Sequence, residues 1–149
     1  MFNTPFHDMR VNAFLMWDPK SRKAIAFDTG ADCRSMLDRV AKEKLAVKLI
    51  LLTHAHTDHI ADLARLKRNR RACLYFGARV HSRRRNDFRR SRIQCWQFEG
   101  ESIANLGHSR GGMTFFVTGL ARPVAIVGDS IFAGSMGGGN VSYKRRAAK

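Results

Sequence analysis

Short apolar runs separated by polar turns make up most of the first half of the chain. The runs at 11–17 and 24–27 flank the polar sequence DPKSRK, in which Pro19 sets a turn conformation. Together they predict a β-hairpin. Apolar residues then recur at helical spacing over 36–45, and Asp32 is placed to cap this predicted helix.

An aliphatic run at 47–53 predicts a strand that is covered on both faces. Helical spacing resumes at Ile60, so the residues between the two lie on a loop that leads from a strand into a helix. In layered α/β folds, functional sites commonly lie on loops of this kind. The sequence THAHTDH fills the loop and supplies His54, His56, Asp58 and His59.

The hairpin pattern recurs in the second half of the chain. Runs at 113–119 and 124–129 flank the turn LARP, and the second run ends on Asp129 as the first hairpin ends on Asp28. This similarity predicts an internal duplication. The 20 residues after Asp129 are glycine-rich and then basic, and they predict a loop and a tail rather than a second helix and strand.

Length and composition predict one globular domain over residues 1–149, since 44% of the residues are hydrophobic. No stretch approaches the roughly 18 apolar residues of a membrane span, and the N-terminal sequence lacks the apolar centre of a secretory signal. We therefore expect a cytoplasmic protein with no membrane partner. The three cysteines are odd in number and widely separated, which argues against a disulfide framework.

The net charge of +15 is concentrated in two places. Residues 65–92 hold twelve Lys and Arg with one acidic residue, and the tail at 143–149 adds four basic residues with none. Neither segment interleaves aromatic with basic residues as a base-stacking surface does. We therefore interpret 65–92 as an atypical basic segment and 143–149 as a basic tail, and we expect no specific nucleic-acid ligand.

The spacing of the histidines has a chemical explanation. Neutral imidazoles and carboxylates are good ligands for zinc and similar ions, and a strand-end loop can turn His54 and His56 toward one point. Asp58 and His59 are placed for a neighbouring point. Two metals about 3.5–4 Å apart hold a hydroxide and stabilise an oxyanion as it forms. The loop therefore predicts a hydrolytic metal centre.

Three motifs resemble the metallo-β-lactamase-fold hydrolases, and in particular the glyoxalase II-like branch. They are THAHTDH at 53–59, LGHSRGG at 106–112 and VGDSIFAGSMGGG at 127–139. The resemblance implies an α/β fold, a metallo-β-lactamase-like αββα sandwich that here lacks the final strand and helix of the second repeat. The ligands that it implies are His54, His56 and His108 for a first metal, Asp58 and His59 for a second, and Asp129 between the two.

The resemblance also implies an activity. It is that of a metal-dependent hydrolase in which Asp58 orients a metal-bound hydroxide toward a thioester or related acyl substrate. One or two Zn²⁺ ions are expected, and Fe²⁺ or Mn²⁺ would suit the same ligands. The family has a further histidine late in its sequence, whereas here no histidine follows His108, and His7 and His81 do not stand where a replacement would.

Two alternatives to the hydrolase stay open at this point. One is a mononuclear iron persulfide dioxygenase on the same scaffold, and the other is a non-catalytic remnant that binds metal. The absent strand and helix would leave apolar surface uncovered, which predicts a marginally stable chain and leaves dimerisation through that surface open.

Asp28 and several glycines each allow two interpretations. Asp28 either accepts a hydrogen bond from a ligand histidine or caps the next turn, and we favour the cap. Gly111 and Gly112 either let the backbone pass close to a metal or serve a turn. Gly128 and Gly134 are interpreted as turn residues.

Overall fold

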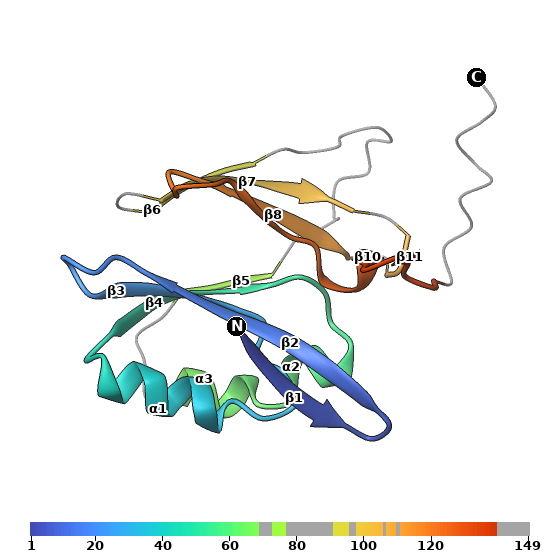
Figure 1. The fold of residues 1–149 in the computed structure, drawn as a ribbon, viewed down its shortest axis with the longest axis horizontal. Helices are drawn as coiled ribbons and strands as arrows, with labels where there is room; N and C mark the ends of the chain where they lie inside the picture. Colours follow the sequence, from blue (N-terminus) through green and yellow to red (C-terminus); the bar gives the residue numbers. More distant parts are fainter. Residues whose placement is uncertain (69–72, 77–90, 96–97, 106, 110, 140–149) are drawn as a thin grey trace. The chain divides into compact units, whose positions relative to one another are not determined.

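The computed structural model describes residues 1–68, 73–76, 91–95, 98–105, 107–109 and 111–139. The chain divides into two compact units, Met1–Phe76 and Gly77–Lys149. Each unit has its own β-sheet (Figure 1). That the two units make up a single domain stays a prediction.

The sheet of the first unit contains five strands in the order β1, β2, β3, β4 and β5. The first three strands pair antiparallel, and the last two join in parallel. Their bounds are Phe2–Phe6, Met9–Trp17, Lys23–Phe27, Ala46–Leu52 and Cys73–Phe76. The hairpin predicted from the two apolar runs is confirmed as β2 and β3, and the strand predicted after it is confirmed as β4. β1 was not predicted.

Helices α1 (Arg34–Lys42) and α3 (Leu63–Arg68) lie on one face of this sheet (Figure 1). A third, short helix, α2, spans Thr57–Ile60. The predicted helix is confirmed as α1, although Cys33 rather than Asp32 holds the cap position. Asp32 still accepts a hydrogen bond from the Arg34 backbone N–H, at 2.9 Å.

The core of the first unit lies between the sheet and these helices. Met36 and Leu66 are fully buried there, against small and aliphatic side chains of β3 and β4 such as Ala24 and Ile50. On the opposite face of the same two strands, Phe27 is also buried. Side chains on both faces of the central strands are therefore buried, as the aliphatic run predicted.

The sheet of the second unit is antiparallel and has the order β6, β7, β8 and β9. The strands span Ser91–Cys95, Phe98–Ala104, Met113–Thr118 and Val124–Ile126. The second predicted hairpin is confirmed, with Phe115 of β8 opposite Ile126 of β9. The first two strands of this sheet were not predicted.

A short 3₁₀ turn, η1 (Gly128–Ser130), follows this sheet and contains Asp129. Strands β10 (Ile131–Phe132) and β11 (Ser135–Met136) then form a small hairpin. Gly134 has a left-handed φ of +82° in its turn, a conformation that favours glycine. The sequence predicted a glycine-rich loop after Asp129, whereas 131–136 form a short hairpin.

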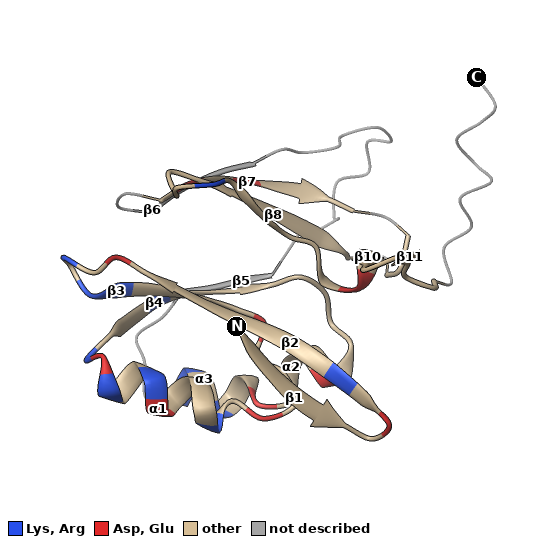
Figure 2. Cartoon of the chain, in the orientation of Figure 1, with Lys and Arg blue, Asp and Glu red and all other residues tan. Residues whose placement is uncertain are grey.

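Basic and acidic residues are interspersed along α1 and its flanks (Figure 2). A guanidinium nitrogen of Arg39 lies 3.3 Å from a carboxylate oxygen of Glu43, and Arg65 Nε lies 3.4 Å from Asp62 Oδ1.

Two predicted basic segments lie mostly or wholly outside the described residues. They are most of 65–92, which includes His81, and the whole of the tail at 143–149, so their predicted roles stay predictions. None of the helices in the described ranges has the length and apolar character needed to cross a membrane.

Replacing Met36 with alanine should destabilise the chain. Met36 is fully buried, and truncating a buried Met to Ala usually costs about 2–5 kcal/mol because it leaves a cavity. Urea unfolding followed by circular dichroism measures the loss. The exposed neighbour Ser35, changed to alanine, is the control and should shift the free energy of unfolding by less than about 0.5 kcal/mol. Equal midpoints for the two variants would contradict this account of the core.

Cys33 should be chemically inert in the folded chain. Burial, and after it the neighbouring Asp62 carboxylate, raise the pKa of its thiol from 9.0 to about 12. Because the folded state keeps the thiol protonated, its contribution to stability is complete below about pH 9 and is lost as the pH rises toward 12.

Iodoacetamide in mildly alkaline buffer should therefore leave the Cys33 peptide unmodified, as read by mass spectrometry of the digested protein. The same treatment in concentrated guanidinium chloride is the control, and there the peptide should be fully alkylated. Equal alkylation under both conditions would show that the thiol is accessible in the folded state.

Candidate metal centre

The end of β4 and the start of α2 carry four of the six predicted ligands. His54 is separated from the end of the strand by one residue, Thr53, and is buried, whereas His56 is exposed. Asp58 and His59 lie in α2 and are buried. The backbone N–H of His59 donates to the His56 carbonyl at 3.0 Å, which closes the turn. The predicted location, a loop leading from a strand into a helix, is what the structure shows.

A buried carboxylate, Asp28, holds this loop in place. One of its oxygens, Oδ1, accepts from the Thr53 backbone N–H at 2.7 Å. The other, Oδ2, accepts from the Thr53 hydroxyl at 2.7 Å and from His59 Nδ1 at 2.9 Å. The cap role that we favoured for Asp28 is therefore wrong, and its alternative role as an acceptor for a histidine is correct. The error arose because its partners lie 25 and 31 positions away along the chain.

The backbone around Asp28 is fixed as well. Asp28 has a left-handed φ of +55°, which aspartate tolerates better than most residues. Its N–H donates to the Leu51 carbonyl at 2.9 Å. The N–H of the next residue, Thr29, donates to the His59 carbonyl at 2.9 Å, and the Thr29 hydroxyl is shared between that carbonyl at 3.0 Å and the Gly30 carbonyl at 2.9 Å. Main chain and side chain thus both bind the loop to the end of β3.

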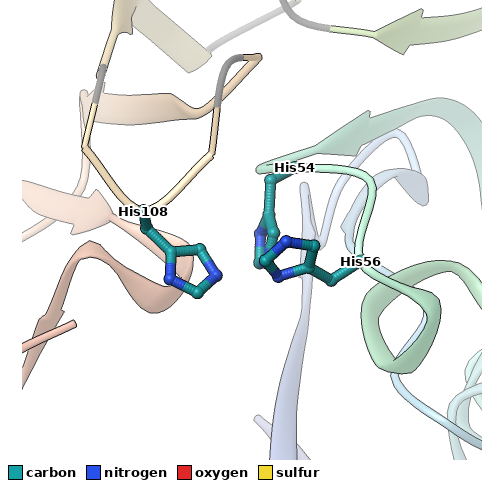
Figure 3. Close-up of side chains that lie close together, drawn as sticks. All are labelled: His54, His56 and His108. Atoms are coloured by element: carbon teal, nitrogen blue, oxygen red, sulfur yellow. The ribbon is translucent and has the colours of Figure 1, made fainter. Parts of the chain in front are cut away.

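The imidazoles of His54 and His56 lie side by side at this loop (Figure 3). His54 Nε2 and His56 Nδ1 are 3.1 Å apart, and the two rings are nearly perpendicular, at 80°. Bonds of about 2.0–2.1 Å from tetrahedral zinc separate two ligand nitrogens by roughly 3.3 Å. The spacing of the two nitrogens therefore fits two positions of the tetrahedron of ligands around one zinc ion.

Asp58 and His59 form a second pair of candidate ligand atoms. His59 Nε2 lies 3.6 Å from Asp58 Oδ2. The His59 ring is also close to the His54 ring, with centroids 4.2 Å apart. Because His59 Nδ1 contacts Asp28, its Nε2 is the nitrogen that faces Asp58. That this pair holds a second ion stays a prediction.

The second unit contains the other two predicted ligands, His108 on the loop before β8 and Asp129 in η1. His108 Nδ1 lies 2.5 Å from the Gly138 carbonyl, which can only accept a hydrogen bond, so His108 donates through Nδ1. His108 Nε2 then faces Asp129 Oδ2 at 3.8 Å. Within this unit the structure brings the imidazole and the carboxylate together.

Two glycines after Asp129 let their backbone pass close to the segments that carry His108 and Asp129. A Cβ on Gly139 would overlap the Gly107 carbonyl and the His108 backbone, and one on Gly137 would overlap the Asp129 carbonyl. Gly112 is tight as well, although its neighbour is the Asn105 carbonyl. Close backbone contact therefore explains these positions better than turn formation does.

Other glycines play simpler roles. A Cβ on Gly111 would meet nothing within 4 Å, so close packing does not explain this residue. Gly128 and Gly134 both have left-handed φ values, +55° and +82°, in keeping with the turn role predicted for them.

The chain belongs to the metallo-β-lactamase superfamily. Residues 8–98 match the family model described as "Metallo-beta-lactamase superfamily". The hydroxyacylglutathione hydrolase of Pseudomonas fluorescens (strain SBW25) is 30% identical over 129 residues, which cover 83% of this chain and 48% of that protein. The hydroxyacylglutathione hydrolase of Bdellovibrio bacteriovorus is 32% identical over 90 residues, or 60% of this chain and 33% of that protein. The chain thus spans half the length or less of these curated relatives.

Solved structures show the same fold. The B3 metallo-beta-lactamase BLEG-1 superposes with a TM-score of 0.75 at 22% identity, covering 95% of this chain and 77% of its own. ETHE1 from Myxococcus xanthus superposes with a TM-score of 0.67 at 21% identity, covering 85% of this chain and 56% of its own. The metallo-β-lactamase fold predicted from the motifs is therefore confirmed.

Sequence reasoning missed two parts of the site. Thr53 was treated only as the end of a strand, although a polar residue closing an aliphatic run was a signal that its side chain has a partner. Gly138 was treated as part of a loop, whereas its carbonyl contacts His108. Local pattern does not identify the distant partners, because Thr53 contacts Asp28 across 25 positions and His108 contacts Gly138 across 30.

Changing Gly139 to alanine should destabilise the second unit. The new methyl group would overlap backbone atoms of Gly107 and His108, and overpacking of this kind costs about 1–3 kcal/mol. Gly138 is the matched control, since a Cβ there would meet nothing within 4 Å. Gly138→Ala should be neutral or slightly stabilising in urea unfolding. If the two variants unfold alike, close approach does not explain the glycine at 139.

Proposed function

We propose that the chain is a metal-dependent hydrolase of the glyoxalase II-like kind. In this proposal one divalent ion is held by His54, His56 and His108, a second is held by Asp58 and His59, and Asp129 binds between them. Zn²⁺ is the proposed metal, and Fe²⁺ or Mn²⁺ would suit the same donors.

The observation that carries this proposal is the pair of facing nitrogens at the end of β4. His54 Nε2 and His56 Nδ1 lie 3.1 Å apart, close to the separation that one zinc ion requires. In both His54 and His59 the other ring nitrogen contacts an oxygen of the protein, as is usual for histidines that bind metal. His108 follows the same rule through Gly138.

The proposed chemistry divides between the metal and the protein. When bound, a divalent ion activates a water molecule and polarises the carbonyl under attack. The chain's own groups hold the reactants in place. We propose that the buried Asp58 carboxylate accepts a hydrogen bond from the attacking water and so orients it toward the substrate carbonyl.

The proposed substrate is a small thioester or a related acyl compound. The support is the similarity to hydroxyacylglutathione hydrolases, at about 30% identity over 83% of this chain.

We also propose that the protein acts in the cytoplasm. The hairpin of β10 and β11 exposes Ile131, Phe132 and Met136, which offers apolar surface for the proposed dimerisation.

Metal content tests the proposed centre. Elemental analysis of protein purified without added metal should find zinc or a similar ion, and His54→Ala should weaken its binding by more than about 100-fold. His7→Asn is the matched control, because His7 is exposed and has a left-handed φ of +51° that asparagine tolerates. Metal content that is equal in the natural chain and in His54→Ala would rule out this centre.

The number and kind of metal distinguish the remaining functions. Zinc together with hydrolysis of a hydroxyacyl thioester of glutathione supports the proposed hydrolase. Iron with oxygen uptake in place of hydrolysis would favour the persulfide dioxygenase. Metal without either reaction would leave a non-catalytic metal-binding protein.

His108→Ala tests whether the second unit contributes to the first metal. If it does, this variant should lose the same ion that His54→Ala loses. If the ion stays bound with unchanged affinity, the ligands at the end of β4 bind it without His108.

A further inference from the structure

The hydroxyl of Thr53 lies between a carboxylate and an imidazole. Its Oγ1 is 2.7 Å from Asp28 Oδ2 and 3.0 Å from His54 Nδ1. All three residues are buried, with no more than 3% of any of them exposed. The hydrogen atoms in this row can therefore be assigned by counting donors and acceptors.

The Thr53 hydroxyl has a single hydrogen to donate, whereas an ionised carboxylate can only accept. Asp28 Oδ2 therefore takes the hydroxyl hydrogen. The contact between Thr53 Oγ1 and His54 then requires His54 to donate through Nδ1. This leaves the lone pair of His54 on Nε2, the atom that faces His56.

We propose that Thr53 is a positioning residue that holds His54 as its Nδ1–H tautomer and so prepares Nε2 for the first metal. The inference rests on the proposed metal centre and adds a residue that binds neither metal nor substrate. Asp28 acts on His59 directly, at 2.9 Å, and on His54 through Thr53. One carboxylate thus orients two candidate ligands by two routes.

A consequence follows for His56. Because His54 Nε2 carries no hydrogen, the 3.1 Å contact between the two rings requires His56 to donate through Nδ1. An ion bound to both nitrogens takes the place of this hydrogen. Metal uptake should therefore shift His56 from its Nδ1–H to its Nε2–H tautomer and leave the hydrogen on His54 Nδ1 in place.

Nitrogen-15 NMR of the histidine rings in the metal-free natural protein tests the assignment directly. The His54 signal, identified by its loss in His54→Ala, should be that of the Nδ1–H tautomer, and the signal should keep this form after zinc is added. A His54 ring protonated on Nε2 in the metal-free protein would overturn the proposal. Since this reading needs no metal, it stays independent of whether the chain proves to be a hydrolase.

Two variants of Thr53 then test its effect on the metal. Thr53→Val keeps the shape but removes the hydroxyl, and it should weaken zinc binding about 10–100-fold in competition with a chelator. Thr53→Ser keeps the hydroxyl and should bind zinc about as tightly as the natural chain. Thr29→Val is the matched control, because its buried hydroxyl contacts the His59 carbonyl rather than an imidazole.

The tautomer separates positioning from a general structural effect. In Thr53→Val the His54 signal should change, while the His59 signal keeps its Nδ1–H form because Asp28 still accepts from it. In Thr29→Val the His54 signal should not change. Unaltered zinc affinity in Thr53→Val, or weaker binding with the His54 tautomer unchanged, would overturn the proposal.

Discussion

The first unit depends on satisfying one buried negative charge. A carboxylate removed from water is costly unless donors surround it, and Asp28 receives three hydrogen bonds, from the Thr53 N–H, the Thr53 hydroxyl and His59. All three donors lie at the end of β4 or in α2. Separating the end of β3 from this loop would therefore leave the Asp28 carboxylate without its donors. The need to keep these hydrogen bonds fixes the positions of the candidate ligands.

The parallel pairing of β3 and β4 makes this arrangement available. Phe27 pairs with Leu51, so the residues just after the two strands meet at the same edge of the sheet. The second unit reaches a similar result differently, because its sheet is antiparallel and a backbone carbonyl, that of Gly138, accepts from His108. In the first unit the buried Asp28 carboxylate orients the His59 imidazole. In the second, the Gly138 carbonyl orients His108, on a backbone that glycine allows to come close.

The elements that could be predicted are those whose sequence pattern is local. The hairpins, α1, β4 and the ligand loop depend on spacing within a few positions, and the sequence predicted them. β1 was missed because its FNTPF sequence contains Pro5, a residue that an edge strand tolerates but that a pattern search takes as a break. β7, with the sequence FEGESIA, has little apolar alternation, and its pairing with β8 specifies it. The role of Asp28 was missed because its partners are distant in sequence.

The two proposed metal sites differ in their ligands and therefore in their preference for zinc. The chain spans about half of a curated relative, yet the groups that orient His54, His59 and His108 all lie within it: Thr53, Asp28 and the Gly138 carbonyl. The proposed first metal draws all three of its histidines from this set and from the neighbouring His56. The ligands proposed for the second metal are one histidine, His59, and two carboxylates, those of Asp58 and Asp129. Since imidazole nitrogen suits zinc better than it suits hard, oxygen-preferring ions, the first site should fill with zinc before the second.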